Sequence, residues 1–202
     1  ELNLVHIDDV IAKIIYLLEN CPNINQVNVS PVNKITVKDL SKTLIDFNIN
    51  RKNFITPEAE EGFNRALYST FISYLPKEGF SYKANIKKDQ RGKFCELLKS
   101  NANGQISFLT INPGYKRGGH YHNTKTEKFV VLKGKVKFSF LSLLDKDSLD
   151  LYSNSENTQI IDSIPGWIHE LENIGKEEAI VLVWVNELYD KKNEDTYYLE
   201  NN

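Results

Sequence analysis

Three of the four histidines in this chain, together with one glutamate, have the types and the spacing of a metal-ligand set. His120 and His122 are separated by one residue, Glu127 follows His120 by seven positions, and His169 lies 47 residues after His122. Neutral imidazole and carboxylate groups are the usual protein ligands of divalent first-row metals. Histidines that are close only by chance are the alternative, but agreement at four positions favours a metal site. The donor types suit Zn, Mn, Fe, Ni or Co.

The spacing of these residues is that of β-strands. Residues two apart in a strand point to the same face, so His120 and His122 should point one way and Tyr121 the other. A second strand carrying Glu127 could return beside the first, and His169 must then come from a third strand. We therefore expect the candidate ligands to be held by a β-structure.

From residue 80 onward, short apolar or alternating segments are separated by turn residues. Gly134 is expected to close the hairpin after the Glu127 strand, and Pro165-Gly166 to turn the chain into the His169 strand. The expected strands are Phe94–Leu98, Gln105–Ile111, Phe129–Leu132, Val136–Leu141, Gln159–Ile161 and Ala179–Val185. Strands at this spacing, with no long helix between them, are typical of an antiparallel barrel or sandwich.

The first part of the chain has a different, mixed α/β texture. We expect helices capped by Asp8 and by Thr36, a third helix with Pro57 in its first turn, and short strands at Leu2–His6 and Val27–Ser30. The predicted parts are therefore residues 1–77, residues 78–190 and a loosely ordered tail, 191–202.

Composition excludes several classes of protein. The formal net charge of −2 and the scattered basic residues argue against a nucleic-acid partner. No apolar run approaches the length of a membrane-spanning helix, so we expect no membrane partner. Cys21 and Cys95 lie far apart, which favours a reducing, cytoplasmic location over a disulfide framework. The chain starts with Glu1 and contains no methionine, as expected for an internal or proteolysed piece of a longer protein.

The ligand pattern reads H-x-H-x₄-E-x₆-G and, further on, PG-x₂-H-x₃-N. It resembles the two motifs of the cupin superfamily, a small jelly-roll barrel, and the resemblance covers residues 80–190. The second cupin motif usually reads P-x-G, whereas Pro165 and Gly166 are adjacent here, but the distance from the glycine to His169 is kept. The resemblance therefore keeps all four residues as metal ligands.

Two further segments, DQRGKF at 89–94 and RGGH at 117–120, resemble those of the cupins that epimerise nucleotide-linked 4-keto sugars, the rhamnose-pathway 3,5-epimerases. The resemblance implies that Arg91 and Arg117 help to hold the nucleotide diphosphate. Guanidinium groups suit such planar, bidentate contacts. A structural salt bridge is an equally good interpretation of Arg91.

Strand parity also predicts two pocket-shaping side chains. Trp167 lies two positions from His169, and Phe129 lies two from Glu127, although a plain core role is the alternative for both. The metal-free epimerases use the histidine of R-G-x-H as the base, which corresponds to His120. A metal-bound imidazole is a poor base, so the catalytic proton acceptor remains unassigned.

The N-terminal part adds a second resemblance. LNLVHIDDVIAKIIYLLEN and VNKITVKDLSKTLIDF resemble the late region of extended short-chain dehydrogenases. A dehydrogenase end joined to this cupin resembles the CapF-type bifunctional capsule enzymes, UDP-2-acetamido-2,6-dideoxy-hexulose reductases. That resemblance implies a zinc ion, C3 epimerisation of a UDP-linked 4-keto-6-deoxy-N-acetylhexosamine by the cupin, and NADPH reduction of the C4 ketone, in the UDP-N-acetyl-L-fucosamine pathway of capsule synthesis.

The chain departs from that family in one respect. Its dehydrogenase-like part, residues 1–77, has no glycine-rich dinucleotide fingerprint and no Tyr-x₃-Lys pair, so we expect NADPH only in the full-length protein and no reductase activity here. The expected fold is α+β in two parts, a truncated Rossmann-type dehydrogenase piece followed by an all-β cupin jelly-roll barrel. The expected partners are a UDP-sugar and a second copy of the chain. Alternatives are a dioxygenase, a sugar-phosphate isomerase, or a non-catalytic sugar-binding or dimerisation module.

Overall fold

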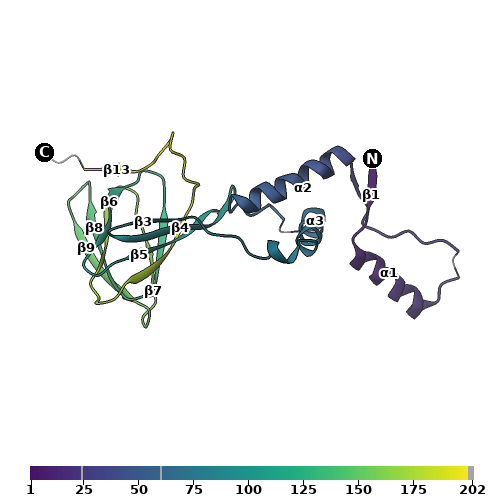
Figure 1. Cartoon of the computed structure of the whole chain (residues 1–202), viewed down its shortest axis with the longest axis horizontal. Coiled ribbons are helices and arrows are strands. Elements are labelled where there is room, and N and C mark those ends of the chain that lie inside the picture. The colour runs from purple at the N-terminus through teal and green to yellow at the C-terminus, as the bar shows by residue number, and fades with distance from the viewer. Residues whose placement is uncertain (24, 60, 200–202) are drawn as a thin grey trace. The chain divides into compact units, whose positions relative to one another are not determined.

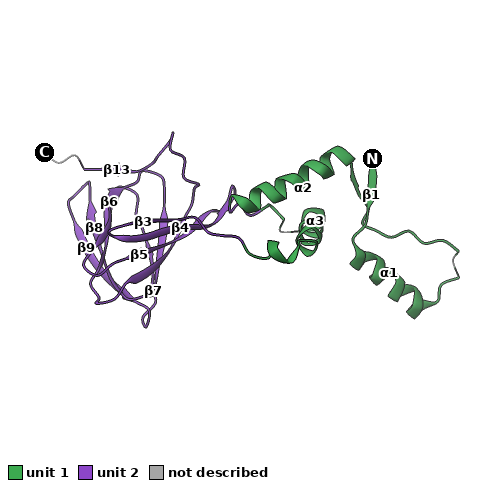
Figure 2. Ribbon diagram, in the orientation of Figure 1, with its two compact units in different colours: residues 1–53, 57–81 green, residues 54–56, 82–202 purple. Residues whose placement is uncertain are grey.

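The computed structural model describes residues 1–23, 25–59 and 61–199, and its contacts divide the chain into two compact units. One unit comprises residues 1–53 and 57–81, and the other comprises residues 54–56 and 82–202 (Figure 2). Residues 54–56 join the second unit because the Thr56 N–H donates to the Lys99 carbonyl at 2.7 Å. Within the described residues, none of the helices combines the length and the apolar character needed to cross a membrane.

The described part of the first unit contains three α-helices and one small sheet. The helices are α1 (Ile7–Asn20), α2 (Val37–Lys52) and α3 (Gly62–Ser73), and a 3₁₀ turn, η1 (Lys77–Gly79), follows them. Strand β1 (Leu2–Leu4) pairs antiparallel with β2 (Asn33–Ile35). A Rossmann-type piece would contribute parallel strands, so this part of the fold prediction is not confirmed.

The N-cap residues in this unit show where local sequence patterns predicted the start of a helix correctly. Thr36 caps α2 as predicted, because its hydroxyl accepts from the Asp39 N–H at 3.0 Å. The cap of α1 is His6 and not Asp8: the His6 ring accepts from the Asp8 N–H at 3.4 Å. Residue preferences alone favour aspartate as a cap. The observed cap instead places Asp8 in the first turn, where its negative charge interacts favourably with the helix dipole.

Two other local predictions in this unit are wrong. The strand expected at Val27–Ser30 is absent, and the pairing with β1 is made by β2, where Ile35 lies opposite Leu2. Pro57 lies five residues before the first residue of α3, Gly62, and so outside the helix. Both errors are short shifts along the chain, which residue preferences alone do not resolve.

The second unit is built from two antiparallel sheets (Figure 1). The six-stranded sheet has the order β10–β7–β12–β5–β4–β3, and the five-stranded sheet has the order β13–β6–β11–β8–β9. The first contains β3 (Ile86–Asp89), β4 (Gly92–Ser100), β5 (Gly104–Ile111), β7 (Glu127–Lys133), β10 (Ile160–Asp162) and β12 (Ala179–Val185). The second contains β6 (Lys116–Tyr121), β8 (Lys135–Ser142), β9 (Ser148–Asn154), β11 (Trp167–Asn173) and β13 (Tyr197–Tyr198). Neither sheet closes on itself over the described residues, so the closed barrel is not confirmed.

A hydrophobic core lies between these sheets. Phe138 and Leu171 come from the five-stranded sheet, Val131 and Val181 come from the six-stranded sheet, and all four are at most 2% exposed. Alternate residues of β8 point inward, as strand periodicity requires. Burying each such side chain stabilises the fold by about 1.5–3 kcal/mol, so the core holds the two sheets face to face.

The chain crosses between the sheets at Gly134, where a hairpin was predicted. Gly134 joins β7 to β8, and these strands belong to different sheets, so the hairpin prediction is wrong. Its φ is 85°, and a Cβ there would lie 2.9 Å from the Cα of Ala179. The crossover therefore needs glycine, and it places the strand that begins with Glu127 in the sheet opposite β6 rather than beside it.

Candidate metal centre and adjoining cavity

Both sheets contribute residues to the candidate metal centre. His120 in β6 and His169 in β11 are register partners on neighbouring strands, and His122 follows the last residue of β6. Glu127 is the first residue of β7 in the other sheet. One ligand atom from each of the four residues lies within 4.8 Å of the other three. The structure thus brings together the four residues that the sequence singled out as a ligand set.

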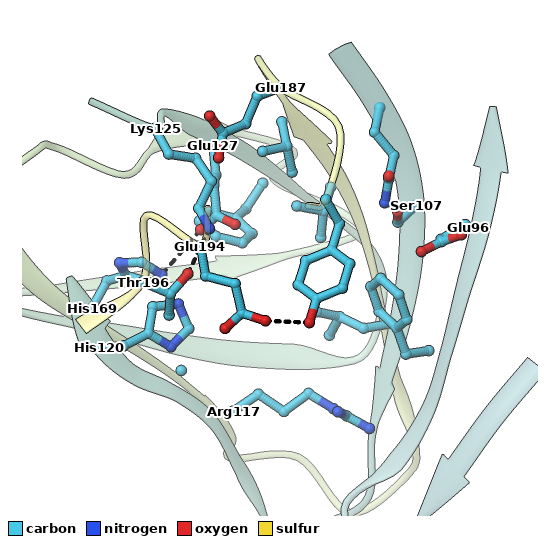
Figure 3. A pocket seen from close by; sticks show the side chains of 18 of the residues that line it. Glu96, Ser107, Arg117, His120, Lys125, Glu127, His169, Glu187, Glu194 and Thr196 are labelled. Carbon is cyan, nitrogen blue, oxygen red and sulfur yellow. Dashed lines mark hydrogen bonds and ion pairs between the residues drawn. The ribbon is translucent and has the colours of Figure 1, made fainter. Parts of the chain in front are cut away.

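The carboxylate of Glu127 is the centre of the group. Its Oε2 lies 3.3 Å from His122 Nε2 and 3.1 Å from His169 Nε2. The ring of His120 completes the set, with its centroid 4.9 Å from that of His122 and 4.7 Å from that of His169. Figure 3 shows His120, Glu127 and His169 converging at one end of a cavity.

The local electrostatics favour an ionised Glu127 and a neutral His120, which are the protonation states in which these groups bind metals. Burial is the largest influence on the Glu127 pKa and raises it, but hydrogen bonds and charge from His122 and His169 outweigh it and hold the pKa well below its usual range. Burial, followed by the charges of His169 and His122, lowers the pKa of His120 to about 4. An ionised carboxylate therefore lies among imidazoles of which at least His120 is neutral.

The environment of His122 tests whether this donor set fits a cation. Its Nδ1 lies 2.5 Å from the backbone carbonyl oxygen of Asp195, so Nδ1 must donate a hydrogen. A neutral ring then presents an unprotonated Nε2 to Glu127 Oε2, and two acceptors 3.3 Å apart need a proton or a cation between them. Because His122 is 2% exposed, water cannot readily screen this contact, and the set fits a divalent cation.

The segment after β12 contacts this site, where the sequence suggested a loose tail. Strand β13 pairs with β6, so that Tyr198 lies opposite His120 and Tyr197 lies opposite Tyr121. The Tyr198 ring centroid lies 5.5 Å from that of His120. The composition of the segment, rich in Asn, Glu and Lys, gave no signal for these contacts; only the two tyrosines have strong strand preference.

Asp195 anchors this segment to the loop between β6 and β7. Its carboxylate accepts backbone hydrogen bonds from Asn123 at 2.9 Å and from Thr124 and Lys125 at 2.7 Å, and it also accepts from the Thr124 hydroxyl at 2.9 Å. Desolvation, the largest influence, raises the Asp195 pKa, but these donors outweigh it and hold the pKa well below its usual range. The sequence alone did not identify Asp195.

A cavity of about 550 Å³ adjoins the ligand set within the second unit (Figure 3). His120, Glu127 and His169 line part of it, and apolar side chains such as Phe129 and Leu171 line another part. A volume of this size is within the range of cavities that bind small molecules. The placement of Phe129 agrees with strand parity.

The two arginines predicted to bind a diphosphate both line this cavity. Arg91 donates from Nε and Nη2 to Asp89 at 3.0 and 2.6 Å, and its side chain is 48% exposed. Arg117 is 13% exposed; its Nε donates to the Thr110 carbonyl at 3.0 Å, and its Nη2 lies 3.5 Å from Asp89. The salt bridge considered as the alternative for Arg91 is therefore present.

Trp167 lies elsewhere. It packs against the hydrophobic core and is not among the described residues that line the cavity. Strand parity placed it on the same face of β11 as His169; Trp167 is the first residue of that strand and lies opposite Ser142 of β8. The core contact that was the alternative interpretation is present, and the pocket role stays a prediction.

Residues that the sequence did not single out line the cavity from the C-terminal segment. The Tyr189 hydroxyl donates to a carboxylate oxygen of Glu194, and Lys125 Nζ donates to the Thr196 hydroxyl at 2.6 Å. Figure 3 shows the side chains of Glu194, His120 and Arg117 lining the same cavity. Acidic, phenolic and cationic groups thus surround one cavity.

Comparison with known proteins identifies the chain's relatives. Residues 87–197 match the family model described as the polysaccharide biosynthesis C-terminal domain. Over 198 residues the chain is 40% identical to UDP-2-acetamido-2,6-beta-L-arabino-hexul-4-ose reductase of Pseudomonas aeruginosa, with 98% of this chain and 53% of that protein covered. The chain therefore spans about half the length of this curated relative.

Crystal structures of CapF share the fold over the whole chain. A CapF structure with the inhibitor 3-isopropenyl-tropolone aligns with a TM-score of 0.92 at 35% identity, covering 99% of this chain and 58% of that one. A structure of the capsular polysaccharide assembling protein CapF from Staphylococcus aureus aligns with a TM-score of 0.91 at 35% identity, covering 99% and 59%.

Proposed function

Because this chain belongs to the polysaccharide biosynthesis C-terminal domain family, we propose that its second unit epimerises a nucleotide-linked sugar during capsular polysaccharide synthesis. The reaction is inversion at C3 of a UDP-linked 4-keto-6-deoxy-N-acetylhexosamine. The observation that carries the proposal is the shared cavity, in which a candidate metal centre, two arginines and a carboxylate–phenol pair line one space. The Pseudomonas relative is named for a UDP-linked hexul-4-ose, which is a sugar with a ketone at C4.

The ketone explains why such a site suits this reaction. Removal of the C3 hydrogen as a proton leaves an enolate on C3, C4 and the C4 oxygen, and return of a proton to the opposite face completes the inversion. No electrons are gained or lost overall. A divalent cation held by His120, His122, Glu127 and His169 would supply Lewis-acid stabilisation of the enolate oxygen, worth several kcal/mol. Zinc is the proposed ion because imidazole and carboxylate donors suit it.

Removal of the C3 proton is assigned to Glu194, whose carboxylate can accept it. Tyr189 donates a hydrogen bond to that carboxylate and orients it, so both lie on one face of the sugar, and the proton returned to the opposite face comes from solvent. The hydrogen bond to Glu194 raises the pKa of Tyr189, so the phenol is protonated at neutral pH. In this proposal His120 binds the metal and does not act as the base, so one imidazole is not assigned both roles.

Nucleotide binding is assigned to the cationic part of the cavity. Arg91 is half exposed, so its guanidinium can exchange Asp89 for a diphosphate oxygen pair. Arg117 is held by the Thr110 carbonyl and adds positive charge beside it. In a longer protein, NADPH-dependent reduction of the C4 ketone would consume the epimerised product. The homodimer and the cytoplasmic location stay predictions.

The experiment is exchange of the C3 hydrogen in D₂O. The chain, loaded with zinc, is incubated with UDP-4-keto-6-deoxy-N-acetylhexosamine, and deuterium at C3 is followed by NMR and mass spectrometry. We expect incorporation at C3 that is lost in Glu194→Gln and kept in Glu170→Gln, whose side chain lies in an ion pair with Lys116. Absence of C3 deuterium with zinc bound would refute the epimerase, and substrate-dependent oxygen uptake would favour the dioxygenase alternative.

A further inference from the structure

The C-terminal segment makes two different kinds of contact through one residue. The side chain of Asp195 holds the backbone of residues 123–125 through three N–H donors. The backbone carbonyl of the same residue accepts from His122 Nδ1. A loop and an adjacent imidazole are therefore fixed to the same point of the chain.

The loop held by Asp195 separates two candidate ligands. His122, directly after β6 of the five-stranded sheet, precedes it, and Glu127, the first residue of β7 in the six-stranded sheet, follows it. Without the three hydrogen bonds, the N–H groups of Asn123, Thr124 and Lys125 would lose their acceptor, and the distance between the two ligands would no longer be set.

The carbonyl contact fixes the chemistry of the ring. A carbonyl oxygen only accepts, so the hydrogen of a neutral His122 lies on Nδ1 and the lone pair on Nε2, which faces Glu127. The opposite tautomer would place a lone pair against a carbonyl oxygen 2.5 Å away. Only the observed arrangement leaves Nε2 free to bind a cation.

We propose that Asp195 is a positioning residue for metal retention, which holds the 123–125 loop with its carboxylate and the ligating tautomer of His122 with its carbonyl. It lies 73 residues from His122 in sequence, and β13, two residues later, pairs with β6 beside His120. Asp195 thus contacts His122 directly and supports Glu127 through the 123–125 loop. The inference rests on the metal-binding part of the proposed function and not on the epimerisation.

The matched substitutions are Asp195→Ala, Asp195→Asn and Asp150→Asn. Alanine removes all four hydrogen bonds made to the carboxylate, and asparagine keeps acceptor capacity on one oxygen only. Asp150 is the control because its carboxylate accepts from Ser139 and pairs with Lys137 in the same unit, on residues outside the ligand set. All measurements use the full chain.

Zinc affinity is measured by competition with a chromophoric chelator, and the site is also loaded with Co²⁺ to record its visible absorption. We expect Asp195→Ala to raise the zinc dissociation constant about 10–100-fold, as loss of a partner that orients a ligand does elsewhere. Asp195→Asn should lie between alanine and wild type. The Co²⁺ spectrum should change in both Asp195 variants and stay unchanged in Asp150→Asn.

Unchanged affinity and an unchanged Co²⁺ spectrum in folded Asp195→Ala would overturn the proposal. A measurement on the unmodified chain covers the case in which the variants do not fold: the imidazole ¹⁵N spectrum of the zinc-loaded protein should show hydrogen on Nδ1 of His122. Hydrogen on Nε2 would also overturn it. If the wild-type chain binds neither zinc nor cobalt, the metal centre and this inference fail together. If it binds zinc without C3 exchange, only the epimerase proposal fails.

Discussion

Glu127 and His169 meet across the two sheets of the second unit: Oε2 of the first lies 3.1 Å from Nε2 of the second, although β7 and β11 belong to different sheets. His122 approaches the same oxygen at 3.3 Å. One carboxylate therefore joins a strand of one sheet to side chains that belong to the other. Removing it should affect both cation binding and the contact between the sheets.

Glu127→Gln tests the first of these effects. Glutamine keeps the shape of the side chain but removes the negative charge, which is the only anionic donor of the four-residue set. We expect zinc affinity to fall by more than about 100-fold, beyond the loss typical of an indirect partner. Competition with a chelator measures the dissociation constant. Glu172→Gln, whose carboxylate lies 3.6 Å from Lys116 and outside the ligand set, is the control and should bind zinc as wild type does.

Metal removal tests whether a bound cation also stabilises the contact between the two sheets. A ligand that binds only the folded state stabilises it by about 2.7 kcal/mol when its free concentration is 100 times the dissociation constant. Since Glu127 lies in one sheet and His120 and His169 lie in the other, this stabilisation should act on the second unit as a whole. Calorimetry with and without EDTA should show a lower unfolding temperature in EDTA that zinc restores. An identical transition in both conditions would contradict a cation bound by residues of both sheets.

Sequence periodicity predicted strands that bury one face, and it missed three of the four strands at the edges of the two larger sheets, all but β10. Segments near β5, β8 and β12 show apolar runs or alternation because they face the core. The missed strands β3, β9 and β13 are all at edges, and every residue of β3 is exposed. An exposed edge strand needs no apolar alternation, so its sequence carries little signal.

The candidate ligands could be predicted from the sequence, whereas the strands and hydrogen bonds that position them could not. His120, His122, Glu127 and His169 were identified from chemistry and spacing, which do not depend on which strands pair. The predicted hairpin at Gly134 failed because sheet membership depends on packing of the whole unit. Asp195 contacts residues about 70 positions away, and a single aspartate in a polar segment does not show which N–H groups it will meet.

Gly118 offers a test of how close β6 must lie to β11. Its φ is +92°, and an added Cβ would lie 2.5 Å from the His169 carbonyl oxygen. Gly119, next to it, has φ +79° and nothing within 4 Å of an added Cβ. Alanine at either position incurs backbone strain of about 1–3 kcal/mol, but only Gly118→Ala also forces the two strands apart.

We therefore expect Gly118→Ala to be less stable than Gly119→Ala by about 1–3 kcal/mol, the usual cost of overpacking. Because His120 and His169 are register partners at this point, Gly118→Ala should also weaken zinc binding more than Gly119→Ala. Urea unfolding and chelator competition on the two variants measure these differences. Equal losses in both would show that the backbone strain alone, and not the close approach to β11, determines the effect.

The proton-transfer assignment is tested by Tyr189→Phe and Glu194→Gln. Each keeps the size of the side chain and removes one acid–base group from the cavity, while the four candidate ligands are left intact. We expect C3 deuterium exchange to fall by about 10²–10⁴-fold in Glu194→Gln, the usual contribution of general acid–base catalysis, with zinc content unchanged. Glu187→Gln removes another carboxylate from the cavity lining and should exchange at the wild-type rate. Normal exchange in Glu194→Gln combined with loss in Glu187→Gln would transfer the role of proton acceptor to Glu187.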